Sequence, residues 1–224
     1  MRMREVSLFV GPSAPASAGT QPLARRGVRL HPPVRRGDVE RLVASLEPAV
    51  IVVCDGVFGS EPAVSHAELC SALDAGWSVW GVSSIGAIRA FELRNEGMHG
   101  FGYVRAQFDR HADFADDEMC LLHVPEAPYT AVSEALVNLR FALERNKAAL
   151  RISDESERRL VAALRGLWFG ERTEARIREL MLEAAGFEPG SADRLLGWLR
   201  QHRVKTLDLI ELMAHRPWER APAR

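Results

Sequence analysis

Three short polar segments each follow an apolar run in the sequence, and they carry residue types suited to acyl-transfer chemistry. They are Gly11-Pro12-Ser13, Asp55-Gly56-Val57-Phe58 and Ser83-Ser84-Ile85-Gly86. If the apolar runs form neighbouring parallel strands, the three segments meet at the carboxyl edge of one sheet, where such folds bind ligands. A serine, a carboxylate and the amide groups of a helix start would then share one crevice.

The third segment has the order of strand, tight turn and helix that is typical of a nucleophile elbow. Ser84 is the better nucleophile candidate, because its hydroxyl could attack a carbonyl or thiocarboxyl carbon while the next amides hold the negative charge. We expect Ser13, Ser83 and Gly86 to contact the substrate. The alternative is that Ser83 or Ser84 only caps the helix, which is a common use of serine.

Four further residues could assist the serine or bind the substrate. His66, at the start of the second helix, is a candidate general base, although an isolated histidine on a helix is more often structural. Asp55 could orient this base or merely complete a turn. Glu68 and Arg89 are candidate substrate-binding residues, and Arg89 could equally form an ion pair with Glu92 or Asp55.

Two other groups of residues resemble reactive sites but have simpler interpretations. Asp116, Asp117, Glu118 and His123 do not predict a metal site, because carboxylates adjacent in sequence diverge along an extended chain. Cys54 could carry a persulfide, but a cysteine that ends an apolar run is generally buried and inert. We therefore predict neither a metal nor another cofactor.

The elements that would position these residues alternate along the first half of the chain. The predicted strands are Val6–Val10, Val50–Cys54 and Ser78–Val82, and the predicted helices are Val39–Leu46, Val64–Ala75 and Ile85–Leu93. This alternation is typical of right-handed βαβ units. It predicts an α/β fold, a three-layer Rossmann-like parallel or mixed sheet, with a C-terminal helical extension.

The second half of the chain is predicted to be mainly helical. A fourth strand is expected at Met119–Val124, followed by helices at Val132–Glu144, Ser153–Leu167, Thr173–Ala185 and Ser191–Leu212. The apolar spacing of three to four residues supports these helices. We therefore place an α/β core domain at 1–150 and the helical extension at 151–224.

Composition narrows the classes of function. The chain has 224 residues and a formal net charge of −1, so no global field attracts nucleic acid or an anionic membrane. Its three cysteines do not form a disulfide framework, and no signal peptide or membrane span is apparent, which indicates a cytoplasmic protein. The oligomeric state is left open, including a homo-oligomer. Lys147 and Lys205 are the two lysines of the chain.

Several unusual motifs occur in an order that resembles the TfuA-like family. From about Val10 to Arg140 they are VGPS, RRGD, DGVF, AVSHAEL, GVSSIGAIRAFEL, GMHGFG, DDE and SEALVNLR. The resemblance implies a partner of a YcaO protein in peptide thioamidation, as in the biosynthesis of modified peptides. It also implies hydrolysis of a thiocarboxylated ThiS-like sulfur-carrier protein, which would deliver sulfide to the precursor peptide site.

The resemblance also implies a catalytic pair of serine and lysine. The serine matches Ser84, whereas the lysine position is occupied by Ala67, which cannot accept a proton. Lys147 and Lys205 lie outside the matching core, although folding could bring one of them back. Either His66 acts as the base, or the protein is a non-catalytic adaptor that docks YcaO with its peptide substrate or sulfur carrier.

Overall fold

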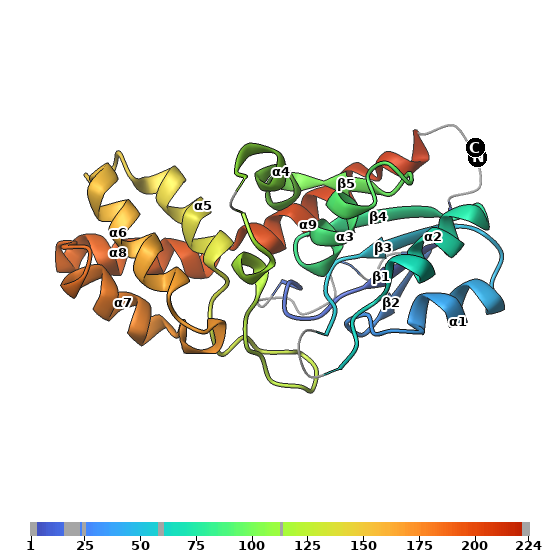
Figure 1. The fold of residues 1–224 in the computed structure, drawn as a ribbon, viewed down its shortest axis with the longest axis horizontal. Helices are drawn as coiled ribbons and strands as arrows, with labels where there is room; N and C mark the ends of the chain where they lie inside the picture. Colours follow the sequence, from blue (N-terminus) through green and yellow to red (C-terminus); the bar gives the residue numbers. More distant parts are fainter. Residues whose placement is uncertain (1–3, 16–22, 24–25, 58–60, 113, 221–224) are drawn as a thin grey trace. The chain divides into compact units, whose positions relative to one another are not determined.

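The computed structural model describes residues 4–15, 23, 26–57, 61–112 and 114–220 (Figure 1). Phe58 of the second polar segment therefore lies outside the described residues. The chain folds into two compact units: Met1–Phe114 together with Lys205–Arg224, which we call the sheet unit, and Ala115–Val204, which we call the helical unit. All three sequence segments with candidate chemistry belong to the sheet unit.

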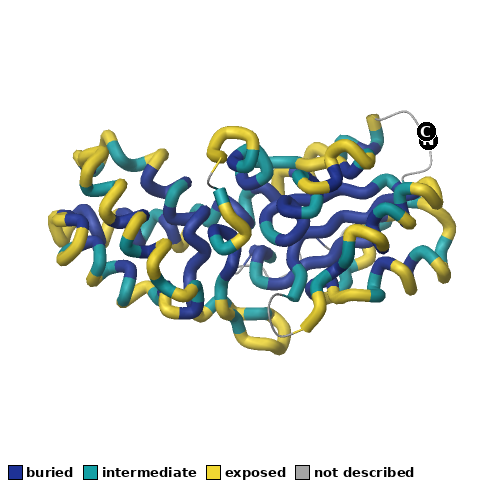
Figure 2. Tube along the Cα trace, viewed as in Figure 1, coloured by how far each residue is buried: buried dark blue, intermediate teal, exposed yellow. Residues whose placement is uncertain are grey.

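The sheet unit is built on five parallel strands in the order β2-β1-β3-β4-β5. They are β1 (Val6–Phe9), β2 (Val28–His31), β3 (Val50–Val53), β4 (Ser78–Val82) and β5 (His99–Phe101). In register, Leu8 lies opposite Leu30 on one side and Val52 on the other. The central strands β1 and β3 are buried along their whole length, as is usual when both faces of a parallel sheet are covered (Figure 2).

Helices cover both faces of this sheet. The helices of the unit are α1 (Asp38–Ser45), α2 (His66–Asp74), α3 (Ile85–Glu92), α4 (Gly102–Arg110), α9 (Val204–His215) and the short 3-10 helix η3 (Pro217–Glu219). Right-handed crossovers from β2 to β3, β3 to β4 and β4 to β5 place α1, α2 and α3 on one face (Figure 1). On the other face, Leu209 and Leu212 of α9 and Trp218 of η3 join the core formed by the strands. The predicted three-layer α/β fold is confirmed, and its sheet is purely parallel.

The helical unit has its own core. Its elements are η1 (Asp116–Met119), α5 (Leu136–Asn146), α6 (Asp154–Arg165), η2 (Phe169–Glu171), α7 (Glu174–Glu183) and α8 (Pro189–Gln201). Each of α5, α6, α7 and α8 contributes apolar residues to one cluster, exemplified by Leu139, Leu160, Ile177 and Leu195. The amphipathic spacing seen in the sequence therefore corresponds to the faces buried in this cluster.

Two predictions for the second half of the chain are wrong. The strand expected at Met119–Val124 is absent from the described residues, because η1 occupies its start and its far end forms only an isolated bridge between His123 and Ala131. The single helix expected at Ser191–Leu212 is two helices, α8 and α9. Helix α8 ends at Gln201 and α9 begins at Val204, so residues 202–203 separate them.

The sequence-based division at residue 150 also differs from the observed units. The helical unit starts at Ala115, and the chain returns to the sheet unit at Lys205, so that α9 packs on the sheet. Among the described residues, the helices are too short or too polar to cross a lipid bilayer.

Candidate functional site

The turn between β4 and α3 has the backbone geometry of an elbow. Ser83 adopts a left-handed conformation with φ of 66°, which is uncommon for a residue other than glycine. The Ser84 N–H donates to Val82 O over 2.8 Å, so the chain reverses within a single residue before α3 begins at Ile85. The sequence-based prediction of a sharp turn between strand and helix agrees with this geometry.

Two glycines allow the elbow helix to lie directly on the sheet. A Cβ added to Gly86 would stand 1.8 Å from Val53 O, and one added to Gly81 would stand 2.0 Å from Gly86 O. Gly86 N also donates to Cys54 O over 3.4 Å. The elbow is therefore fixed against both β3 and β4, because no side chain separates the backbones.

The two elbow serines have different surroundings. Ser84 is half-buried, occupies the N-cap position of α3 and makes no side-chain capping hydrogen bond there. Ser83 is fully buried, and its hydroxyl donates to the backbone carbonyl of Lys205 over 2.6 Å. The proposed nucleophile is thus not engaged as a helix cap. The hydroxyl of Ser83, which was predicted to contact the substrate, bonds the backbone of α9.

Asp55 lies at the end of β3, next to β1, where the strand order of the sheet changes direction. Its buried carboxylate accepts hydrogen bonds from Gly11 N at 2.9 Å, Ser13 N at 2.9 Å and Ser13 Oγ at 2.8 Å. The predicted convergence of the first two polar segments is therefore observed. These three bonds tie the loop after β1 to the end of β3.

The structure places His66 away from the elbow serines. Its Nε2 atom lies 2.7 Å from Glu92 Oε2, and Arg89 Nη1 donates to the same oxygen over 2.6 Å. Burial acts to raise the pKa of Glu92, but the bonds from His66 and Arg89 outweigh it and hold that pKa below its usual range. Glu92 is eight residues after Ser84, about 12 Å along the helix axis. No hydrogen bond between His66 and Ser84 is present among the described residues.

Glu68 supports local structure at the start of α2. Together with Ser65 it forms a capping box, in which Glu68 Oε1 accepts from Ser65 N and Ser65 Oγ accepts from Glu68 N. Its second oxygen accepts from Gly37 N over 2.6 Å. These bonds join α2 to the start of α1. Ala67 is exposed on the same helix.

Cys54 is enclosed by the polar residues at the strand ends. Its side chain is completely buried, and its Sγ lies 3.8 Å from Asp55 Oδ2. Burial raises the pKa of the thiol well above its usual value and Asp55 raises it further, while Ser83, Lys205 and Ser13 act in the opposite direction. A thiol in these surroundings stays protonated and is a poor nucleophile.

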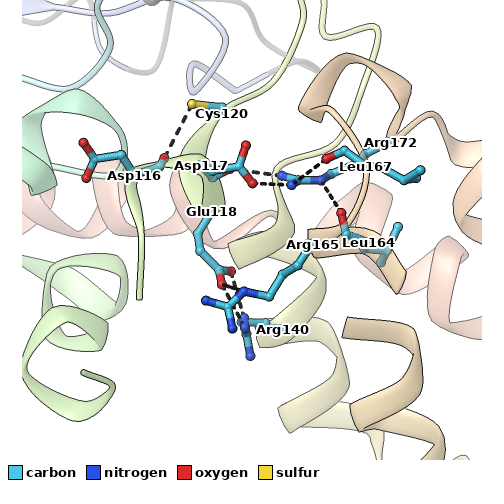
Figure 3. Close-up of polar contacts among 9 residues, drawn as sticks. All are labelled: Asp116, Asp117, Glu118, Cys120, Arg140, Leu164, Arg165, Leu167 and Arg172. Atoms are coloured by element: carbon cyan, nitrogen blue, oxygen red, sulfur yellow. Dashed lines mark hydrogen bonds and ion pairs between the residues drawn. The ribbon is translucent and has the colours of Figure 1, made fainter. Parts of the chain in front are cut away.

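The acidic segment before residue 120 forms ion pairs with arginines of the helical unit (Figure 3). The buried Arg172 guanidinium binds the Asp117 carboxylate and also donates to Asp117 O and Leu164 O. Glu118 is buried and accepts two hydrogen bonds of 2.8 Å from Arg140, with Arg165 3.5 Å away. No group of residues suited to bind a metal ion occurs in the part of the chain that the structure describes.

Sequence reasoning left open whether folding brings Lys147 or Lys205 back to the elbow, and the structure places the backbone of Lys205 there. Its side chain is 3% exposed, and its position in the sheet unit depends on a contact between residues more than one hundred positions apart. Local sequence gives no signal for such a contact. The one available indication was its type, because lysine is scarce in this chain.

Comparison with known proteins identifies one family. The family model described as TfuA-like protein matches residues 55–173, which is more than half of the 224 residues. The match includes Asp55, the elbow and the acidic segment, but neither Ser13 nor α9. No curated protein shows detectable sequence similarity to the chain. On the strength of the family match, the chain belongs to the TfuA-like protein family.

Proposed function

We propose that the protein hydrolyses a thiocarboxylated ThiS-like sulfur carrier and supplies sulfide for YcaO-dependent thioamidation of a precursor peptide. Its family membership supports a role in a YcaO-associated pathway. The main observation in support of the proposed hydrolysis is the elbow at Ser83-Ser84. There a half-buried serine without a capping bond starts a helix that packs directly on the sheet. We also propose that the reaction takes place in the cytoplasm.

The proposed reaction balances without a cofactor. Ser84 Oγ forms a bond to the thiocarboxyl carbon, the C–S bond breaks, and the electron pair and a proton leave as hydrogensulfide. Water then cleaves the resulting ester, which gives the carrier carboxylate and restores the serine. The positive end of the α3 dipole favours the negative charge that develops on the carbonyl oxygen.

The supporting residues take defined parts in this proposal. Asp55 and Ser13 hold the loop after β1 at the edge of the sheet. His66 would have to leave Glu92 before it could accept the serine proton, since Glu92 lies at the other end of α3. An unchanged kcat in a His66→Gln variant would show that His66 is not the general base.

The experiment measures sulfide release from a purified thiocarboxylated ThiS-like carrier, with intact-mass analysis of the carrier product. Ser84→Ala should lower kcat by about a hundredfold or more. Ser45→Ala is the matched control, because the Ser45 hydroxyl donates to Leu42 O of its own helix. Equal rates for wild type and Ser84→Ala would contradict serine catalysis.

The second candidate function is a non-catalytic adaptor between YcaO and its peptide substrate or sulfur carrier. It is favoured by the absence of lysine at position 67 and by the pairing of His66 with Glu92. In a reconstituted YcaO reaction, an adaptor with the Ser84→Ala change would retain full thioamide yield. A hydrolase with this change would lose the yield unless free sulfide is added.

A further inference from the structure

The RRGD motif at residues 35–38 follows β2 at the carboxyl edge of the sheet. Residues 26–41, which include this motif, carry five arginines and two acidic residues, although the whole chain has a net charge of −1. Arg35 and Arg36 are both exposed. This edge of the sheet unit therefore has a local positive charge that the overall composition does not reveal.

Backbone contacts bring the start of this motif to the elbow. Val34 N donates to Asp55 O over 2.9 Å, and Val34 forms a parallel bridge with Gly56. A Cβ added to Gly56 would stand 2.8 Å from Ile85 Cγ2 and 2.9 Å from Val34 O. Because Ile85 directly follows Ser84 in the sequence, the motif begins on the same part of the carboxyl edge as the candidate nucleophile.

The backbone around Arg36 is held by hydrogen bonds to more distant residues. Arg36 N donates to Pro62 O over 3.1 Å. The next residue, Gly37, has a left-handed conformation with φ of 85°, and its N–H donates to Glu68 Oε2 over 2.6 Å. The Arg36 side chain therefore starts from a fixed point, so that less conformational freedom is lost when it binds a ligand.

The two arginines of the motif differ in their pairing. Arg35 Nη1 lies 3.0 Å from Glu61 Oε2, so the charge of Arg35 already has a counterion. Arg36 makes no ion pair in the part of the chain that the structure describes. Its planar guanidinium can bind a carboxylate through two parallel N–H···O bonds. Arg36 is therefore available to an anion from outside the protein.

We propose that Arg36 binds the anionic terminus of the sulfur carrier and holds it at the elbow. A thiocarboxyl terminus is ionised at neutral pH, as a carboxyl terminus is. Pairing with Arg36 offsets the negative charge that would otherwise repel the Ser84 oxygen during attack. This inference rests on the proposed function. It assigns the selection of an anionic substrate to a residue that lies before the family match, which starts at residue 55.

The test uses the full chain and the carrier in two forms. Fluorescence anisotropy gives the Kd of the labelled carrier in its carboxylate form, which has no C–S bond to hydrolyse, and the thiocarboxylated form gives kcat and KM. Arg36→Gln should raise both Kd and KM by about 5- to 30-fold, because a charge-assisted pair is lost. The kcat should stay within about threefold of wild type. Arg35→Gln should have a smaller effect, since Arg35 is already paired with Glu61.

A carrier that ends in an uncharged amide identifies the anion that Arg36 binds. Wild type and Arg36→Gln should bind this carrier with Kd values within about twofold of each other. A loss for Arg36→Gln that is as large with the amide as with the carboxylate would overturn the assignment to the terminus.

Arg94→Gln is the matched control for the loss of one exposed arginine. Arg94 lies just after the other end of α3, and its replacement should leave Kd within about twofold of wild type. Thermal melting establishes that each variant is folded. An effect of Arg94→Gln equal to that of Arg36→Gln would show that only the net charge of the protein matters, which contradicts the proposal.

The outcomes separate this inference from the proposed function. If wild type binds and hydrolyses the carrier and Arg36→Gln matches it, only the role of Arg36 fails. If the carboxylate carrier binds through Arg36 while the thiocarboxylate is not hydrolysed, the role of Arg36 is supported and the proposed hydrolysis fails. If wild type binds neither form of the carrier, both proposals fail.

Discussion

Replacement of Asp55 distinguishes a structural from a chemical role for this buried carboxylate. Asp55→Ala removes the acceptor for the Gly11 N–H, the Ser13 N–H and the Ser13 hydroxyl. Each buried backbone donor left without a partner costs about 1–3 kcal/mol, so the two amides together give a loss of about 2–6 kcal/mol. We expect the free energy of unfolding of Asp55→Ala to fall by that amount.

Asp55→Asn should be much milder. The asparagine oxygen can take the place of Oδ2 and accept both amides, while its NH2 group donates to Ser13 Oγ, which then acts as acceptor. Only the extra strength of bonds to a charged acceptor is lost, which corresponds to about 1–2 kcal/mol. The expected order of stability is therefore Asp, then Asn, then Ala.

The assay is urea denaturation followed by tryptophan fluorescence, combined with hydrogen exchange at the Gly11 and Ser13 amides. Both amides should lose protection in Asp55→Ala and keep most of it in Asp55→Asn. Asp109→Ala, at a side chain 61% exposed, is the control and should stay within about 0.5 kcal/mol of wild type. A loss below about 1 kcal/mol for Asp55→Ala would refute the reasoning. A stable but inactive Asp55→Asn would show that the charge itself takes part in the chemistry.

Three further predictions concern packing, pH and the helical unit. Gly86→Ala should destabilise the protein by about 1–3 kcal/mol or more in urea denaturation, because the new Cβ would meet Val53 O at 1.8 Å. Unchanged stability would show that the backbone of the elbow can shift to make room for the methyl group. Burial raises the pKa of Asp208 from 3.8 to about 7. The contribution of this pKa shift to the free energy of unfolding is therefore full below pH 3.8 and is lost as the pH rises through about 7. The free energy of unfolding of Asp208→Asn, relative to that of wild type, should therefore rise by up to about 4 kcal/mol between pH 4 and pH 8. Denaturation at both pH values measures this, and an equal difference at the two pH values would contradict the pKa shift. Arg172→Met should lower the free energy of unfolding by about 3 kcal/mol, because it leaves the Asp117 and Leu164 carbonyls without their donor. Circular dichroism melts check this prediction. A loss of stability no larger than the experimental error would exclude a structural role for Arg172.

The strands that could be predicted from sequence are the ones with continuous apolar runs. Val50–Val53 and Ser78–Val82 lie inside the sheet and are apolar because both faces are covered. The edge strands Val28–His31 and His99–Phe101 are partly exposed and contain arginine, histidine and glycine. Their composition does not differ from that of a loop, so the sequence did not reveal them.

Some parts of the candidate site are specified by neighbouring residues in the sequence, and others depend on contacts between distant segments. The elbow follows from neighbouring residues, since Gly81, Ser83 and Gly86 specify its backbone within six positions. The bonding of His66 to Glu92 and the return of Lys205 depend on how helices pack, which periodicity along one segment does not encode. Sequence reasoning therefore found the candidate nucleophile more readily than the groups around it.

The return of the chain to the sheet unit has a consequence for folding during synthesis. Leu8, Val52 and Val82 lie in one core with Leu209 of α9, so this core lacks a layer until that helix has been made. The ribosome must first produce the whole intervening helical unit, about ninety residues, which takes roughly 5–18 s at typical rates. The nascent protein therefore passes through a stage in which apolar strand residues are uncovered, and a chaperone has time to bind them.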